Sequence, residues 1–333
     1  MLPDRRHWLT STATGLALGL ASTTVGGGRT QAAEPPPSEK PIPKPAQQPA
    51  GKAATDGVQP NEQAAENSTT SDSGIRQSVM GWCFAPMPAL ELASIGKQLG
   101  LVAIEGIDSS HYPKVKELGL DVSLVSSHGF VAGPVDTNNH PAVEKALRKA
   151  IDIAVAVDCA NVITFTGMRV PGMSDEVSKQ NCLDGWKRVI DYAEAKHITL
   201  CLEHLNSRDD SHPMKGHPGY FGDDVELCIE LIQKMDSPNF RLLFDIYHVQ
   251  IMHGDVIRRI RELHPWIAHY HTAGNPGRCE IDEHQELNYA PILAAILGTG
   301  YTGYVAHEFI PTWDSPTESL KHAIELTRAC KAS

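Results

Sequence analysis

Short apolar runs alternate with amphipathic stretches from residue 75 to the end of the chain. In the amphipathic stretches apolar side chains recur at helical spacing, so helices are expected at, for example, residues 141–157 and 174–196. The apolar runs have the length of β-strands. Strands are expected at residues 78–83, 101–105, 122–126, 161–166, 198–203, 241–245, 267–272 and 303–308.

Eight strands, each followed by a helix, over about 255 residues are typical of a single (β/α)8 TIM barrel of the α/β class. A doubly wound open sheet is the competing architecture. Such a sheet usually has a Gly-rich phosphate loop after its first strand, whereas residues 81–86 read Gly-Trp-Cys-Phe-Ala-Pro and do not match one. The pattern therefore favours the barrel.

The first 74 residues differ in composition and are expected to lie outside the barrel. Arg5 and Arg6 precede a short apolar stretch and then small residues up to Ala33, the order of an export signal of the twin-arginine type. Residues 34–74 are rich in Pro, Gln, Ser and Thr and are expected to form a disordered linker. The prediction is a signal at 1–33, a linker at 34–74, a barrel at 75–333 and a periplasmic protein. A basic, disordered N-terminus on a cytoplasmic protein is the alternative.

Charge and cysteine content narrow the function classes. The formal net charge is −11, and proteins that bind the phosphate backbone usually carry a basic face, so no nucleic-acid partner is expected. The apolar stretch near the N-terminus is too short to span a membrane stably. The seven cysteines are scattered without a CxxC pair and are expected to be free thiols, mostly buried.

The last four expected strands each end in a side chain that can bind a metal. These are Glu203, Asp245, His271 and Glu308. In a TIM barrel the C-terminal ends of the strands meet at one mouth, where functional groups lie. Carboxylates buried together without a partner are costly, so the four ends indicate a cation. Three carboxylates and one imidazole suit a divalent ion such as Mn²⁺, Mg²⁺, Co²⁺ or Zn²⁺. Any one of them alone would more often cap a helix, form a salt bridge or fill the core, so the inference depends on all four.

The C-terminal part of the chain resembles the hydroxypyruvate isomerases. The resemblance is carried by Glu203-His-Leu-Asn206, by Asp245-Ile-Tyr-His-Val-Gln-Ile-Met-His-Gly254, by Gly274-Asn-Pro-Gly-Arg278 with Glu286-Leu-Asn-Tyr289, and by Gly300-Tyr-Thr-Gly-Tyr-Val-Ala-His-Glu-Phe-Ile-Pro311. It spans most of residues 78–330 and is most specific from Leu200 onward. It implies membership of the xylose-isomerase-like barrels, which include the tagatose epimerase and endonuclease IV families.

By this resemblance, Glu203 and Glu308 would be both metal ligands and the two groups that transfer a proton. Asp245 and His271 would complete the metal shell. His248 and Arg278 match positions that hold substrate oxygens in these families. Their alternatives are a cap at a helix start for His248 and a solvated loop charge for Arg278.

Glu105, at the end of the second expected strand, and His128, just past the third, are further candidate pocket residues. A structural role is equally open for each. Two features depart from the hydroxypyruvate isomerases. His271 stands where those enzymes usually have Gln and sugar epimerases typically have His. The acidic segment 279–285 replaces a shorter Gly-rich loop and is expected to lie over the mouth of the barrel.

The resemblance implies a metal-dependent isomerase that interconverts hydroxypyruvate and tartronate semialdehyde, or a similar small hydroxy-carbonyl compound, by enediolate chemistry. A ketose 3-epimerase on the same scaffold is the nearest alternative and is favoured by His271. A DNA-repair endonuclease and a non-catalytic sugar-binding barrel are less favoured, because the chain is acidic and retains both glutamates. The expected partner is a small hydroxy-carbonyl compound or sugar, and a homo-oligomer is left open.

Overall fold

The computed structural model describes residues 73–331, so the predicted signal and nearly all of the predicted linker lie outside the described residues. The described part contains a strand at each of the eight expected places. The strands are β1 (Arg76–Val79), β2 (Ala103–Ile104), β3 (Asp121–Val122), β4 (Asn161–Thr164), β5 (Thr199–Glu203), β6 (Phe240–Asp245), β7 (Ile267–Thr272) and β8 (Tyr304–His307). The prediction of a barrel-forming series of strands is confirmed.

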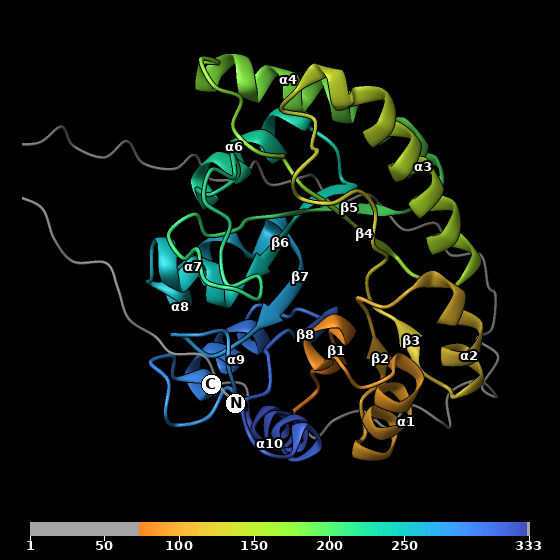
Figure 1. Cartoon of the computed structure of the whole chain (residues 1–333), viewed down its shortest axis with the longest axis vertical. Coiled ribbons are helices and arrows are strands. Elements are labelled where there is room, and N and C mark those ends of the chain that lie inside the picture. The colour runs from red at the N-terminus through yellow and green to blue at the C-terminus, as the bar shows by residue number, and fades with distance from the viewer. Residues whose placement is uncertain (1–72, 332–333) are drawn as a thin grey trace, which may run out of the picture. The chain divides into compact units, whose positions relative to one another are not determined.

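The strands are parallel and curl into a TIM-barrel-like fold (Figure 1). Six of them form one sheet in the order β1-β8-β7-β6-β5-β4, and β2 and β3 form a separate pair. Hydrogen bonds join this pair to both edges of the larger sheet. The Glu105 amide donates to the Val79 carbonyl at 2.9 Å, and the Val125 amide donates to the Asn161 carbonyl at 2.9 Å. The eight strands therefore follow one another around a single ring.

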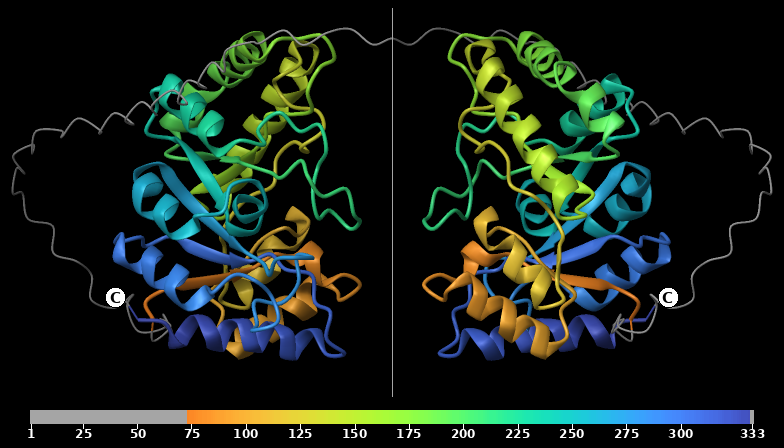
Figure 2. Two further views of the ribbon diagram at one scale, coloured as in Figure 1. Left: turned by 90° about the vertical axis from the view of Figure 1, so that its left-hand side faces the viewer. Right: turned by 90° about the vertical axis from the view of Figure 1, so that its right-hand side faces the viewer.

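The helices lie outside the strands (Figures 1 and 2). They are α1 (Ala89–Leu99), α2 (Tyr112–Glu117), α3 (His140–Ala156), α4 (Asp175–Lys187), α5 (Ile190–Ala195), α6 (Val225–Met235), α7 (Ile246–Met252), α8 (Val256–Leu263), α9 (Tyr289–Gly298) and α10 (Pro316–Ala329). In α3 the buried residues Val143, Leu147 and Ala150 recur at helical spacing, which gives the helix one apolar face toward the core. Within residues 73–331, no helix is long and apolar enough to cross a membrane.

Two predicted element boundaries were wrong. The helix expected at 174–196 is divided into α4 and α5, because Val189 leaves helical geometry with φ −132°. The first strand ends at Val79 and is followed by a short 3-10 helix, Gly81–Phe84. At Gly81 a Cβ would lie only 2.3 Å from Ile107 Cγ2, so the chain turns where it passes close to the loop after β2.

The alternation of side chains along the strands separates two parts of the core. Leu200 and Leu202 of β5 pack in the large cluster of buried residues, and Cys201 between them packs in a small second cluster with Leu243 of β6. Because successive strand residues point to opposite faces, Glu203 at the end of β5 lies on the same face as Cys201. Asp245 lies on the same face as Leu243 for the same reason. The period of two therefore turns the strand-end carboxylates toward the barrel axis. All seven cysteines are free and six are buried, as predicted.

A large-to-small substitution in the outer layer tests this packing. Leu242 is fully buried, so Leu242→Ala is expected to lower the free energy of unfolding by roughly 2–5 kcal/mol, through lost apolar contact and a cavity. Urea unfolding followed by circular dichroism measures the change. Val177→Ala on α4 is the control, because Val177 is 50% exposed and its truncation should change stability by less than about 0.5 kcal/mol. Equal effects of the two substitutions would contradict the assignment of Leu242 to the core.

Candidate active site

The four strand-end residues converge at the C-terminal mouth of the barrel. One ligand atom from each of Glu203, Asp245, His271 and Glu308 can be chosen so that all four lie within 4.8 Å of one another. Hydrogen bonds fix the backbone at these ends. Tyr220 Oη donates to the carbonyl of Glu203 at 2.9 Å, and the Glu308 amide donates to the carbonyl of Thr272 at 2.9 Å. The residues that the sequence predicted as one cluster are therefore brought together.

Three atoms that face the centre of this cluster form no hydrogen bond of regular geometry among residues 73–331, and each lies within ion-pair distance of another of them or of Arg278. They are Nδ1 of His271, Oε1 of Glu203 and Oε2 of Glu308. His271 Nδ1 lies 2.6 Å from Glu308 Oε2 and 3.4 Å from Glu203 Oε1. Carboxylate and imidazole atoms that converge in this way in a buried space need positive charge, and they fit a cation. Imidazole and carboxylate donors also suit a borderline or hard divalent ion. These residues therefore have the chemistry of a metal site.

The two carboxylate oxygens of Asp245 have different contacts. Oδ1 accepts hydrogen bonds from the amides of Tyr247 at 2.8 Å and His248 at 3.3 Å, which caps the N-terminus of α7. Oδ2 lies 3.4 Å from Arg278 Nη2 and 3.5 Å from His248 Nε2. Asp245 therefore caps α7 with Oδ1 and directs Oδ2 at the cluster.

Glu105 lies behind His271 and does not line the cavity described below. Its Oε1 is 2.7 Å from His271 Nε2, and its Oε2 is 2.9 Å from His269 Nε2. Ser123 Oγ donates to Oε2 at 2.5 Å. A carboxylate accepts the ring proton when it is hydrogen-bonded to an imidazole nitrogen, which places the proton of neutral His271 on Nε2. Nδ1 then keeps its lone pair and faces Glu203 and Glu308.

Burial and mutual charge shift the pKa values in this cluster. Burial raises the pKa of Asp245 to about 7, with Glu308 adding to the rise and Arg278 opposing it. Burial also raises the pKa of Glu203. In Glu308 the effect of burial is outweighed by Arg278 and His271, which hold its pKa well below the usual range. Burial thus opposes ionisation of Asp245 and Glu203, whereas Arg278 and His271 favour ionisation of Glu308.

The pKa of His271 is raised, although burial of an imidazole lowers its pKa. Burial alone would lower the pKa of its imidazole, but the carboxylates of Glu308, Glu105 and Glu203 outweigh this and raise the pKa well above its usual value. The surrounding carboxylates therefore favour positive charge at this ring, and a cation beside Nδ1 would supply such charge.

His248 presents an unpartnered nitrogen to the cluster. Its Nδ1 accepts hydrogen bonds from the amide and the side chain of Asn206, at 3.2 and 2.7 Å, so in the neutral ring the proton is on Nε2. Nε2 has no hydrogen-bond partner in the described part of the chain, and the ring is fully buried. Burial lowers the pKa of His248 well below its usual value, so the ring is neutral. His248 therefore offers one N–H donor toward the site.

Arg278 is 2% exposed and contacts protein groups with most of its guanidinium. Its Nη2 lies 2.7 Å from Glu308 Oε2 and 3.4 Å from Asp245 Oδ2. Its Nη1 donates to the Met214 carbonyl at 2.5 Å, and its Nε donates to the Glu308 carbonyl at 3.3 Å. The sequence predicted Arg278 as a substrate contact, and the structure places it beside the carboxylates at the cavity.

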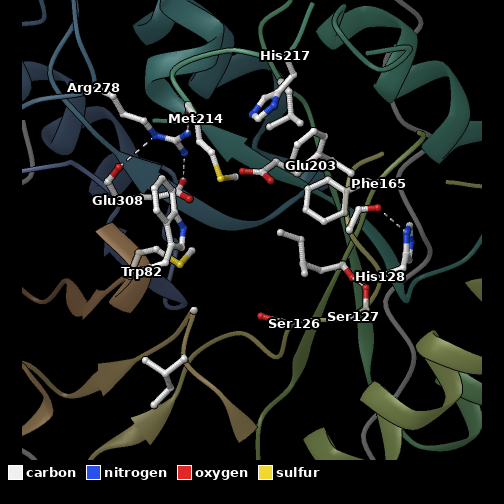
Figure 3. Close-up of a pocket in the computed structure, with 17 residues that line it drawn as sticks. Trp82, Ser126, Ser127, His128, Phe165, Glu203, Met214, His217, Arg278 and Glu308 are labelled. Carbon is white, nitrogen blue, oxygen red and sulfur yellow. Dashed lines mark hydrogen bonds and ion pairs between the residues drawn. The ribbon is translucent and has the colours of Figure 1, made fainter. Parts of the chain in front are cut away.

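A cavity of about 360 Å³ opens beside the cluster (Figure 3). Trp82, Arg278 and Glu308 lie on one side of it, Phe165, Ser127 and His128 lie on the other, and Glu203 and Met214 lie between them. His128, predicted as a pocket residue, does line this cavity. The cavity is also lined by four aromatic residues that the sequence did not indicate, namely Trp82, Phe130, Phe165 and His217. They lie in loops or apolar runs without a recognisable spacing.

The acidic segment 279–285 does not line this cavity, contrary to the expectation that it covers the mouth. Glu280 is 2% exposed, and its carboxylate accepts hydrogen bonds from Thr312, Trp313 and Ser319. Glu280 is therefore turned into the protein and fixes the chain before α10, whereas Glu283 and His284 of the same segment are exposed. The sequence did not reveal this because the hydrogen-bond partners of Glu280 are more than 30 residues away.

Comparison with known proteins agrees with the fold. The family model of the xylose isomerase-like TIM barrels matches residues 113–330, and the chain belongs to this family. A 2-oxo-tetronate isomerase of Pectobacterium atrosepticum is 26% identical over 259 residues, which are 72% of this chain and 96% of that protein. A Homo sapiens protein named "Putative hydroxypyruvate isomerase" is 27% identical over 248 residues, 73% of this chain and 82% of that protein.

Among solved structures, the 3-keto-D-glucoside 4-epimerase of E. coli superposes with a TM-score of 0.65 at 18% identity. The match covers 77% of this chain and all of that chain (100%). At this identity the likeness concerns the fold. The named relatives are isomerases, so the resemblance to the hydroxypyruvate isomerases is confirmed.

Proposed function

We propose that this chain is a metal-dependent isomerase or epimerase that transfers a proton between positions on a small hydroxy-carbonyl compound. The observation that carries the proposal is the convergence of one ligand atom from each of Glu203, Asp245, His271 and Glu308 within 4.8 Å of one another, beside a cavity. The isomerase names of the relatives support the same reaction type.

Glu203, Asp245, His271 and Glu308 would hold the metal in this proposal. A bound divalent cation would supply Lewis-acid stabilisation of the negative charge that develops on the substrate oxygens. Glu105 positions His271 through Nε2 and so leaves Nδ1 for the cation. Carboxylate–histidine pairs of this kind commonly orient metal-binding imidazoles.

The proton transfer is assigned to Glu203 and Glu308, both of which line the cavity. The C–H bond next to a carbonyl is weakly acidic, so one carboxylate removes that proton and an enediolate forms. The other carboxylate starts in its protonated form and gives its proton to the neighbouring carbon in an isomerase, or to the opposite face of the same carbon in an epimerase, and proton exchange with water then restores both groups. The Nε2–H of His248 is free to donate to the substrate oxygen, and Arg278 keeps Glu308 ionised.

Two substrates follow from different observations. The relatives favour the interconversion of hydroxypyruvate and tartronate semialdehyde. A ketose 3-epimerase is the second candidate, because His271 occupies the position where the hydroxypyruvate isomerases usually have Gln. The predicted export signal, if it functions, adds weight to an extracellular sugar or sugar acid.

Removal of either glutamate tests the proton transfer. Glu203→Gln and Glu308→Gln are each expected to slow exchange of substrate carbon-bound hydrogen with heavy water by roughly 10²–10⁴-fold, because neither amide can act as a base. Nuclear magnetic resonance of the Mg²⁺-loaded protein with hydroxypyruvate, and separately with ketoses, measures the exchange. Glu283→Gln is the control, since Glu283 is exposed. Exchange at the wild-type rate in both cavity variants would contradict the mechanism.

The pH dependence of metal binding tests the cluster itself. In the metal-free protein Asp245 has a pKa of about 7 and His271 is protonated, so a binding metal must displace protons from both. Affinity is therefore expected to rise from pH 6 to pH 8, by up to about tenfold per pH unit for each proton released. Titration calorimetry with Mn²⁺ in buffers of different ionisation enthalpy counts the protons. Binding that is equally tight at pH 6 and pH 8 would count against these ligands.

The support that Glu105 gives to His271 can be separated from general stability. In Glu105→Gln a single oxygen replaces the two that accept from the imidazoles, so His271 is less firmly held with its proton on Nε2. We expect Mn²⁺ to bind roughly ten- to hundredfold more weakly. Calorimetry at pH 8 measures the affinity, thermal unfolding checks that the variant is folded, and Glu283→Gln again serves as the control. An unchanged affinity in a folded variant would show that Glu105 does not position the ligand.

A further inference from the structure

The loop that follows β5, residues 206–217 and here called the β5 loop, borders the cavity and is closed on itself. Its two ends are joined, because the His217 amide donates to the Asn206 carbonyl at 2.7 Å. Met214, within the loop, lines the cavity (Figure 3). A loop whose ends lie close together is a compact unit held by the contacts of its own residues. In the β5 loop several of those contacts are made by Asn206.

The side-chain amide of Asn206 bonds to the loop with both of its ends. Oδ1 accepts from the Asp209 amide at 3.1 Å, and Nδ2 donates to the Lys215 carbonyl at 2.8 Å. An amide turned by half a rotation would place its oxygen against the Lys215 carbonyl and its NH2 group against the Asp209 amide. Both of those contacts would be repulsive, so two backbone groups of the loop determine the orientation of the Asn206 amide.

The same NH2 group also reaches His248. Nδ2 of Asn206 lies 2.7 Å from His248 Nδ1, and the Asn206 backbone amide lies 3.2 Å from the same nitrogen. Both groups are donors only, so Nδ1 of the neutral ring accepts and the ring proton is on Nε2. The orientation that the β5 loop gives to one amide therefore sets the tautomer of this imidazole.

The tautomer decides what His248 presents to the site. Its Nε2 lies 3.5 Å from Asp245 Oδ2 and forms no hydrogen bond within residues 73–331. With the proton on Nε2, the ring offers a donor to an oxygen that enters the site. With the proton on Nδ1, a lone pair on Nε2 would face the Asp245 carboxylate and would repel a substrate oxygen.

The packing of the β5 loop leaves no spare room around Asn206. A Cβ at Gly216 would lie under 3.0 Å from Asn206 Oδ1 and from the Asp209 carbonyl oxygen, so only glycine allows this close approach. Tyr247, next to His248 in α7, donates from Oη to the Lys215 carbonyl at 2.9 Å. The loop and the start of α7 are therefore joined at two neighbouring points.

Closure of the loop accounts for only part of what Asn206 does. The contacts with Asp209 and Lys215 would suffice to close it. The contact with His248 joins the loop to a different element, 42 residues further along the chain, and ends on a ring that borders the metal cluster.

We propose that Asn206 is a positioning residue that links the conformation of the β5 loop to the proton donor of the site. The loop orients the amide, the amide holds His248 with its proton on Nε2, and Nε2–H then meets an oxygen of the substrate. The proposal rests on the proposed function, in which His248 donates to that oxygen. It adds that the donor is present only while the β5 loop keeps this conformation beside the cavity.

The protonation of each ring nitrogen can be measured directly. Long-range nitrogen–proton correlation spectra of the Mg²⁺-loaded full chain, with isotope-labelled histidine, distinguish a protonated ring nitrogen from an unprotonated one. The signals of His248 are those that are absent from His248→Gln. We expect Nε2 of His248 to be protonated and Nδ1 to be unprotonated in the wild type.

The variant Asn206→Ala removes the shorter of the two donors to His248 Nδ1. Only the backbone amide at 3.2 Å remains, so the second tautomer should become populated and its signals should appear in the spectrum. The kcat of hydrogen exchange in heavy water should fall about tenfold, because the lost donor acts on charge that develops on the substrate oxygen. KM should change by less than about threefold. The substrate is the compound, hydroxypyruvate or a ketose, that the wild type exchanges fastest.

The variant Gly216→Ala disturbs the loop at a position that does not line the cavity. Its Cβ has no room beside Asn206 Oδ1, so the amide must move, and the spectrum of His248 should change as it does in Asn206→Ala. Gly298→Ala is the matched control, because a Cβ there meets nothing within 4 Å and Gly298 does not line the cavity. It should leave the spectrum and the exchange rate unchanged. Thermal unfolding verifies that each variant is folded.

The outcomes separate this proposal from the proposed function. A His248 ring that keeps its proton only on Nε2 in folded Asn206→Ala and Gly216→Ala would overturn the proposal and leave the isomerase reaction standing. A wild-type ring protonated on Nδ1 alone would overturn it as well. Absence of exchange with every compound, in wild-type protein that has bound the metal, would contradict the proposed function, whatever tautomer the spectra show.

Discussion

The carboxylates of Glu203, Asp245 and Glu308 are at most 5% exposed and lie around Nδ1 of a single imidazole. Like charges in a buried space repel one another and are poorly solvated, so the arrangement needs positive charge to persist. Arg278 and His271 supply positive charge beside Glu308, and Arg278 also faces Asp245. The proposed metal would add to that charge. The fold around the cluster serves to keep these four side chains close.

The interior of the barrel contributes to that constraint. Below the mouth, Glu105 is fully buried and contacts His269, His271 and Ser123. The opposite part of the interior is apolar, with Leu124, Ile163, Cys201 and Leu243 packed together. On the polar side of the barrel interior, hydrogen bonds hold His271. On the apolar side, packing holds β5 and β6. Both halves limit the movement of the strand ends that carry the cluster.

Much of this could be predicted from the sequence. The strand positions follow from short apolar runs, and the period of two then directs Glu203, Asp245 and His271 to the same side, so their convergence was predictable. Contacts between distant segments were not. Glu105 contacts His271 across 166 residues, and Glu280 is turned inward by Thr312 and Ser319. His217 and Phe165 lie in segments without periodicity, so nothing in the sequence marked them as neighbours of the cavity.

The central claim is that Glu203, Asp245, His271 and Glu308 bind one divalent cation. Anomalous diffraction from crystals grown with Mn²⁺, recorded near the manganese absorption edge, locates the ion directly. The account predicts one strong peak per chain, within coordination distance of an oxygen from each carboxylate and of His271 Nδ1. A map without a peak at this cluster, in crystals of folded protein at a saturating Mn²⁺ concentration, would contradict it.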